Sequence, residues 1–295
     1  RGAGSSPLNR VRARPWMNEG VSVTFTVATV NVNGMRAAAR KGMGEWLASC
    51  GADVVTFQEV RAPEDLVEGL VGQGWRSAAH ASMLKGRAGV AVAVREGLEG
   101  ANVGEVRRLL PNLEADSHTG RWLELDVEDA LGDGMDLTVI SMYMHSGNVD
   151  KPQTMADKYE MLEGAWSRVE ELRTSGRHVL LTGDLNIAHT NLDIKNWKGN
   201  LKSAGFLPEE RAYIDRLLEA GQWVDVHRAL AGDVPGPYTW WSQRGKAFDN
   251  DSGWRIDYHL ASKGLATRAA SARVDRAASY DTRWSDHAPL VVTYE

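Results

Sequence analysis

Several features that define whole classes of protein are scarce in this chain. Its 295 residues include one cysteine, Cys50, which excludes an intramolecular disulfide and a thiolate metal cluster. The longest apolar runs, near 90–94 and 137–143, are as short as strands, so we expect no membrane span. Basic residues are not in excess, because 34 Lys and Arg face 39 Asp and Glu, for a formal net charge of −5. These absences favour a cytosolic protein, in which any nucleic-acid contact comes from a local basic face.

The remaining composition fits a large globular domain. Hydrophobic residues make up 43% of the chain and charged residues 25%, and we expect residues 21–295 to form a single domain. Residues 1–20 are basic, aperiodic and rich in Gly, Pro and Ser, without the apolar centre of a secretory signal. We interpret them as a disordered end, either a natural extension or a remnant of expression.

Periodicity predicts an α/β protein. Apolar alternation and short apolar runs predict strands at 21–30, 53–57, 89–94, 121–127, 137–143, 179–183, 238–241, 254–260 and 290–294. Spacing of three to four residues predicts helices at 35–49, 63–71, 154–173 and 208–220, with Thr154 as the N-cap of the third. Strands are often separated by short turns, and helices interrupt only some of them. This order favours two mixed β-sheets packed together, with helices outside.

The stretch 179–193, VLLTGDLNIAHTNLD, organises the rest of the chain. A buried strand stops at Gly183 and delivers Asp184 and Asn186 at its exit. Because the two residues are two positions apart, an extended backbone would point them to the same side. A carboxylate beside a carboxamide supplies a general base and an orienting group. His189, in the same stretch, is interpreted as a structural residue of the following loop.

Polar side chains recur at the ends of the predicted strands. These ends carry Asn31, Asn33, Glu59, Tyr143, Asp184, Asn186, Asp257, Asp286 and His287. If the ends converge, the site contains carboxylates, amides, a phenol and an imidazole. Oxygen ligands of this kind suit Mg²⁺ or Mn²⁺ rather than zinc. Such a site is suited to attack by water on a phosphodiester, with the metal and the imidazole offsetting charge on the phosphoryl oxygens.

Each of these residues also has an ordinary structural interpretation. These interpretations are a turn for 31–34, a solvent-facing strand end for Glu59, a salt-bridge partner for Asp257, a strand aromatic for Tyr143 and a structural histidine for His287. We prefer the functional interpretation because the structural one requires an independent coincidence at every strand end.

The same residues lie in longer motifs that resemble a known family. The motifs are NVNGMR (31–36), FQEVRAP (57–63), GDLNIAHTNLDI (183–194), SAGFLPEER (203–211), GWRIDYHLAS (253–262) and SDHAPL (285–290). They resemble, in the same order, the exonuclease III family of DNA repair nucleases, which includes abasic-site endonucleases. The resemblance covers residues 24–295 and implies a four-layered α/β sandwich of the endonuclease/exonuclease/phosphatase superfamily.

The resemblance implies a role for each strand-end residue. Glu59 corresponds to the main Mg²⁺ ligand, with Asn33 and Asp286 beside it. Asp184 corresponds to the residue that activates water, with Asn186 and Asn31 as its hydrogen-bonding neighbours. His287 corresponds to the histidine that contacts the scissile phosphate, Asp257 to its partner, and Tyr143 to the tyrosine at the phosphate or leaving group. Which residue is the general base stays open at this point.

The implied partner is double-stranded DNA with abasic sites or 3′ ends, bound by a monomer. A basic rim is expected from Arg36, Arg40, Lys41, Lys85, Arg87, Lys195, Lys198, Arg244 and Lys246. The alternative is that these are scattered solvated side chains. By resemblance, Trp240, Trp254 and Ile256 are candidates for a pocket that accepts a flipped-out abasic sugar. Trp241 is equally compatible with a place in the core.

Two positions depart from the family pattern. Relatives usually follow the tyrosine with Pro and then Asn or Gln, whereas this chain has His145 and Ser146. We interpret His145 as a surface-loop residue, the alternative being that it alters phosphate contacts or metal preference. Asn33 stands where some members carry Asp, which affects how a metal is held.

The resemblance therefore implies an Mg²⁺-dependent hydrolase that cuts duplex DNA on the 5′ side of abasic sites, trims 3′ ends and clears 3′ blocking groups. One alternative is a related phosphohydrolase acting on inositol phosphates or sphingomyelin, because the GDxN and SDH residues are shared across the superfamily. SAGFLPEER and GWRIDYHLAS favour the DNA repair branch over it. The other alternative is a binding module without activity, which the retention of Glu59, Asp184 and His287 disfavours.

Overall fold

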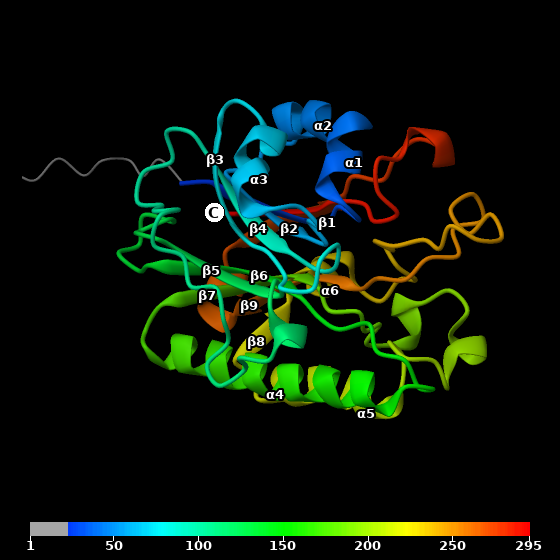
Figure 1. Cartoon of the computed structure of the whole chain (residues 1–295). Coiled ribbons are helices and arrows are strands. Elements are labelled where there is room, and N and C mark those ends of the chain that lie inside the picture. The colour runs from blue at the N-terminus through cyan, green and yellow to red at the C-terminus, as the bar shows by residue number, and fades with distance from the viewer. Residues whose placement is uncertain (1–22) are drawn as a thin grey trace, which may run out of the picture.

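Two β-sheets stacked face to face form the centre of the fold (Figure 1). The computed structural model describes residues 23–295, so the predictions for 1–20 and for the start of the first strand lie outside the described residues. The first sheet has the strand order β10-β11-β1-β2-β4-β3 and the second β5-β6-β7-β9-β8. The first contains β1 (Phe25–Asn31), β2 (Val54–Gln58), β3 (Trp75–His80), β4 (Val90–Arg95), β10 (Ala269–Val274) and β11 (Leu290–Tyr294). The second contains β5 (Trp122–Val127), β6 (Leu137–Tyr143), β7 (His178–Asp184), β8 (Trp223–Asp225) and β9 (Asp257–Ser262).

Helices cover the outer face of each sheet (Figure 1). The first sheet is covered by α1 (Met35–Arg40), α2 (Met43–Ser49) and α3 (Glu64–Val71). The second is covered by α4 (Pro152–Thr174) and α5 (Pro208–Glu219). Two short helices, α6 (Val226–Ala231) and α7 (Lys263–Ala266), follow β8 and β9. The expected four-layered α/β sandwich is therefore confirmed.

Strand β7 shows how an apolar run contributes to two core layers. Successive strand residues point to opposite faces of a sheet. Leu180 accordingly enters the cluster between the two sheets, together with Val27 and Leu125. Leu181 points the other way and packs under α4 and α5 with Leu162. A strand buried on both faces reads as a continuous apolar run, which is why this one was visible in the sequence.

The strand directions bring the polar strand ends to one edge. Strand β1 runs parallel to β2, and β6 runs parallel to β7, so each pair ends on the same side. In the second sheet Tyr143 lies opposite Asp184. Strand β9 is antiparallel to β7, so its first residue, Asp257, also lies opposite Asp184. Strand β11 is antiparallel to β1, and therefore the residues just before it reach this edge as well.

Several predicted elements differ in detail. The helix at 35–49 is two helices, because Gly42 adopts a φ of 114° between them. The long helix begins at Pro152, and Thr154 lies inside it, where its hydroxyl donates to the carbonyl of Lys151. The run at 238–241 is not a strand, since only isolated bridges join Trp240 to Trp254 and to His287. Strands β3, β8 and β10 were not predicted.

Between residues 23 and 295, none of the helices combines the length and the apolar character that a membrane crossing requires.

Candidate active site

Asn31 joins the two sheets at the edge where the strands end. Its amide nitrogen donates to Asp184 Oδ2 at 2.9 Å and to Glu59 Oε1 at 3.0 Å. The hydroxyl of Tyr143 donates to the same Glu59 oxygen at 2.8 Å. Burial and the charge of Glu59 raise the pKa of Tyr143 well above its ordinary value, so the phenol keeps its proton. The structure thus brings these four predicted site residues into one hydrogen-bonded network.

Asp184 and Asn186 lie together, but not for the reason expected. Strand β7 ends at Asp184, and Asn186 has a left-handed φ of 50°, so a tight turn replaces the extended backbone. The Asn186 backbone N–H donates to Asp184 Oδ1 at 2.8 Å, and its side-chain amide donates to the Met144 carbonyl at 2.9 Å. Position 183, just before them, requires glycine, because a Cβ there would lie 2.0 Å from the Met142 carbonyl oxygen.

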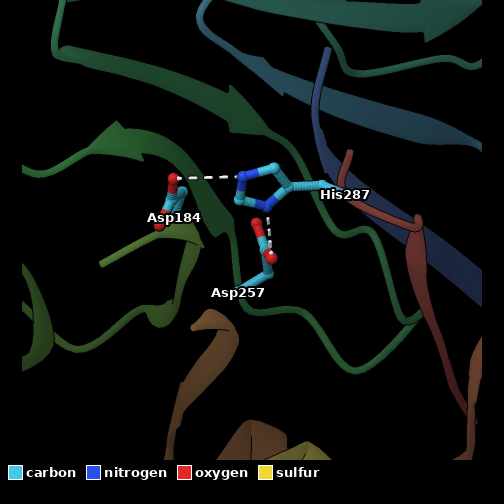
Figure 2. Close-up of side chains that lie close together, drawn as sticks. All are labelled: Asp184, Asp257 and His287. Carbon is cyan, nitrogen blue, oxygen red and sulfur yellow. Dashed lines mark hydrogen bonds and ion pairs between the residues drawn. The ribbon is translucent and has the colours of Figure 1, made fainter. Parts of the chain in front are cut away.

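His287 lies between two carboxylates (Figure 2). Its Nδ1 is 2.9 Å from Asp257 Oδ2, and its Nε2 is 3.8 Å from Asp184 Oδ2. All three side chains are almost fully buried. Their ligand atoms lie within 4.8 Å of one another, so this group has the geometry to hold a metal ion.

Burial and charge act in opposite directions on the pKa values of His287 and Asp184. Burial alone would lower the pKa of His287, but the charge and hydrogen bond of Asp257, helped by Asp184, raise it to about 10. Burial raises the pKa of Asp184 to about 7, against the opposing effect of the His287 charge. An imidazolium and a carboxyl group that titrates near neutrality are suited to acid–base chemistry.

Glu59, Asn33 and Asp286 form the neighbouring part of the site. The Asn33 amide donates to Asp286 Oδ1 at 2.9 Å, and the Trp240 indole N–H lies 3.2 Å from Asp286 Oδ2. The guanidinium of Arg61 contacts Glu59 Oε2. Asn33 and Glu59 both have left-handed backbones, with φ values of 45° and 50°. Non-glycine residues rarely adopt this conformation, and it is often found at functional sites.

A cavity of about 560 Å³ opens onto both parts of the site. It is lined by Glu59, Tyr143, Asp184 and His287 together with the aromatic candidates Trp240 and Trp254 and with Ile256. The two indole rings meet edge to face, at 81°, with centroids 6.0 Å apart. Trp241 is 2% exposed and belongs to a separate core cluster with Phe248. The cavity therefore has a polar floor and an apolar wall.

The predicted basic residues fall into two groups. Arg36, Lys85 and Arg87 line one hollow of about 320 Å³. A second hollow, of about 410 Å³, contains Arg36, Arg40 and Asn33, and the last of these also lines the active-site cavity. The remaining candidates are exposed residues outside these two hollows, namely Lys41, Lys195, Lys198, Arg244 and Lys246. A basic surface therefore adjoins the site on the side of α1.

The interpretation of His145 as a surface residue is wrong. Its side chain is buried, and its Nε2 lies 3.2 Å from His118 Nδ1. Burial, with the nearby charge of Arg121, lowers the pKa of His145 to about 2, so the ring is neutral. His189 contacts Asp215 of α5, 2.7 Å away.

Two features near the site were not predicted. Arg61 contacts Glu59 and lines the cavity. A cation two residues after a strand-end carboxylate was a signal in the sequence. Thr239 Oγ1 accepts the backbone N–H of Asp257 at 3.2 Å, and the Thr239 carbonyl accepts the N–H of Ala288 at 2.8 Å. Nothing in the sequence pattern distinguishes Thr239.

Comparison with known proteins identifies the family. The profile of the Endonuclease/Exonuclease/phosphatase family matches residues 28–287. An exodeoxyribonuclease of Bacillus subtilis (strain 168) is 32% identical over 264 residues, which cover 88% of this chain and 95% of that protein. A DNA-(apurinic or apyrimidinic site) endonuclease of Dictyostelium discoideum is 26% identical over 266 residues, which cover 90% of this chain and 69% of that protein.

Solved structures agree with the sequence relatives. An AP endonuclease from Archaeoglobus fulgidus superposes with a TM-score of 0.77 at 25% identity, over 92% of this chain and 99% of that chain. The 3′-5′ exonuclease NExo from Neisseria meningitidis gives 0.78 at 25% identity, over 92% and 100%. Fold and site define the class of protein, an enzyme that hydrolyses phosphodiesters. The chain belongs to the Endonuclease/Exonuclease/phosphatase family, and the resemblance noted in the sequence is confirmed.

Proposed function

We propose that this protein hydrolyses phosphodiesters of duplex DNA, cutting on the 5′ side of abasic sites and removing nucleotides and blocking groups from 3′ ends. The observation that carries the proposal is the cavity in which Glu59, Asp184 and His287 meet an apolar wall. The relatives support DNA as the substrate, because they are named as an exodeoxyribonuclease and an apurinic-site endonuclease, and because a Neisseria 3′ phosphatase of the same fold was solved with a product DNA hairpin.

The donor set fits a hard divalent cation. Glu59 presents a carboxylate beside the Asn33 and Asp286 pair, and all their donor atoms are oxygens of the kind that Mg²⁺ and Mn²⁺ prefer. Glu59 Oε2 already contacts a cation, the guanidinium of Arg61, as expected for a carboxylate that attracts positive charge. When bound, the metal ion would stabilise charge on the phosphoryl oxygens. We prefer this set to the group of Asp184, Asp257 and His287. Carboxylates face both nitrogens of that imidazole and keep it protonated, so it has no lone pair to offer a metal ion.

Asp184 is the group that we propose to accept the proton of the attacking water. Its raised pKa lies near neutrality, where a general base works best. Asn31 and Asn186 hold its two oxygens, one each, by hydrogen bonds of 2.9 and 2.8 Å. Water then attacks phosphorus, the bond to the leaving 3′ oxygen breaks, and that oxygen takes a proton from solvent to become a 3′-hydroxyl.

His287 is proposed to stabilise the phosphoryl oxygens as a positive hydrogen-bond donor. Asp257 keeps the ring charged and fixes its orientation through Nδ1, which leaves Nε2 facing Asp184 and the cavity. Tyr143 keeps its proton and lies on the same cavity wall, where it would contact the phosphate or the leaving group. Preorganised donors of this kind are among the largest contributions to catalysis.

The wall and the basic surface provide the proposed DNA contacts. Trp240, Trp254 and Ile256 line the apolar side of the cavity, where a sugar that has lost its base would bind. Arg36, Lys85 and Arg87 would bind backbone phosphates in the adjoining hollow. Lys195, Lys198, Arg244 and Lys246 are exposed and would extend this contact. We also propose that residues 21–295 act as one domain and that the protein is a cytosolic monomer.

The test is incision of a duplex that carries one stable abasic analogue. We expect cutting on the 5′ side of the analogue with Mg²⁺, no cutting with EDTA, and no internal cutting of a matched undamaged duplex. Trimming of a recessed 3′ end and release of a 3′-phosphate are measured under the same conditions. Phosphate release from inositol phosphates or hydrolysis of sphingomyelin, with all DNA substrates intact, would instead support another activity of the superfamily.

A further inference from the structure

An ion pair is buried between the two outer helices, behind the active-site cavity. Lys158 of α4 and Glu210 of α5 are in direct contact, and both side chains are 0% exposed. Burying two charges costs several kcal/mol per ion unless each is also well hydrogen-bonded. The ordinary place for lysine and glutamate on outer helices is the solvent-facing side. A pair in this position therefore requires an explanation in terms of what else it contacts.

The remaining hydrogen bonds of the pair all go to loops. The Lys158 ammonium donates to the carbonyl of Asn186 at 2.9 Å and to that of Ser146 at 3.3 Å. Together with Glu210, these contacts use all three of its donors. The second oxygen of Glu210 accepts the backbone N–H groups of Gly205 and Leu207, at 2.6 and 3.0 Å.

Three of these loop residues line the active-site cavity. Ser146 follows β6, Asn186 follows β7, and Gly205 precedes α5, yet all three are in the cavity wall. The loops also touch one another, because a Cβ on Gly205 would lie 2.9 Å from the Asn186 carbonyl oxygen and 3.2 Å from the Trp254 ring. A change at the ion pair would consequently reach Asn186 and, through Gly205, the aromatic wall.

We propose that Lys158 and Glu210 are positioning residues that hold these three loops in place around the reacting groups. They contact no substrate atom, and they act through the backbone of Ser146, Asn186 and Gly205. The inference rests on the proposed function for its kinetic consequences, but its structural part does not depend on it. A displacement of about 1 Å at a positioned group can cost about a hundredfold in rate.

Helix α4 also offers a matched control. Arg168, on the same helix, donates to Glu124 at 2.8 and 2.9 Å, and Glu124 is buried and bonded to Arg107 as well. Neither Arg168 nor Glu124 lines the active-site cavity. The variant Arg168→Met therefore removes a charged contact from α4, leaves Glu124 paired, and does not touch the loops.

The test variant is Lys158→Met combined with Glu210→Gln. The glutamine carbonyl can still accept the Gly205 N–H, and the apolar methionine leaves no unpaired charge, while the carbonyls of Ser146 and Asn186 lose their donor. Three measurements are compared with wild type and with Arg168→Met: the thermal midpoint, kcat and KM on the abasic duplex, and hydrogen exchange of peptides covering 143–147, 184–189 and 203–207. We expect faster exchange in these peptides and kcat lower by about tenfold to a hundredfold, with KM within about threefold.

Hydrogen exchange is measured without substrate, so the outcome is decisive even if wild type fails to cut abasic DNA. In that case the proposed function fails, while faster exchange confined to the three peptides still supports the positioning role. If the double variant shows the same exchange and kcat as Arg168→Met, the positioning role is overturned. If the double variant does not fold, Glu210→Gln alone replaces it, with the same peptides and a smaller loss of kcat expected. Unchanged exchange in Glu210→Gln would then overturn the proposal.

Discussion

The charge on His287 can be altered without removing the ring. In Asp257→Asn the amide oxygen can still accept the Nδ1 proton at the 2.9 Å position, so the ring keeps its orientation. What is lost is the negative charge that favours the imidazolium. Asp257 is fully buried, and solvent therefore does not screen its effect on His287.

The size of the effect follows from the pKa. The rise for His287 from 6.5 to about 10 corresponds to about 5 kcal/mol in favour of the charged ring. If the substitution returns the pKa to 6.5, about one ring in ten is charged near pH 7.5, and burial lowers this fraction further. We expect a loss of at least about tenfold in kcat at that pH.

The sign of the pH dependence distinguishes this account from simple damage. The ratio of variant to wild-type kcat should be highest near pH 6 and should fall about tenfold for each pH unit above about 6.5. The control is Asp133→Asn, because Asp133 lies 2.9 Å from His178 at the other end of β7. Its kcat ratio should stay near one throughout. A ratio for Asp257→Asn that is low but independent of pH would refute the role assigned to the charge.

Three further predictions concern the metal, the wall and the fold. Glu59→Gln should raise the Mg²⁺ concentration needed for half-maximal rate by at least about tenfold, and an unchanged Mg²⁺ titration would rule out Glu59 as a ligand. Trp254→Ala should lower kcat/KM on the abasic duplex by about tenfold, as expected for a truncated contact in a binding pocket, and should leave the thermal midpoint within a few degrees. A kcat/KM equal to that of wild type would show that the aromatic wall does not bind the substrate. Arg255→Met should lower the free energy of unfolding by about 3–5 kcal/mol, because it leaves the buried carboxylates of Asp193 and Asp225 without their shared partner. The measurement is denaturant unfolding, and a change below about 1 kcal/mol would contradict this prediction.

The strands that the sequence revealed are mostly those buried on both faces. Strands β1, β2, β6 and β7 are buried along almost their whole length and lie inside the sheets. The three unpredicted strands, β3, β8 and β10, are all at sheet edges. In β10 the residues are small or polar and partly exposed, so neither an apolar run nor a clean alternation was present. Edge strands depend on their neighbour for pairing, and a single sequence does not show that neighbour.

The site residues also differ in whether the sequence pattern or only the folded structure reveals them. Residues at strand ends could be found because parallel strands bring their ends together, as Tyr143 and Asp184 show. His145 was misjudged because it is followed by Ser and Gly, which suggest an exposed turn, whereas His118 packs against it. Lys158 lies at helical spacing between Met155 and Leu162 of the buried stripe, but its partner is 52 residues away. Such pairs require the fold before they can be recognised.

The proton acceptor tests the central claim most directly. Asp184→Asn keeps the size of the side chain and removes its ability to take a proton from water, so the single-turnover rate of incision should fall by about a hundredfold or more with saturating Mg²⁺. Binding of the abasic duplex, measured in EDTA, should stay within about threefold of wild type. Incision by Asp184→Asn at the wild-type rate would contradict the account of this site.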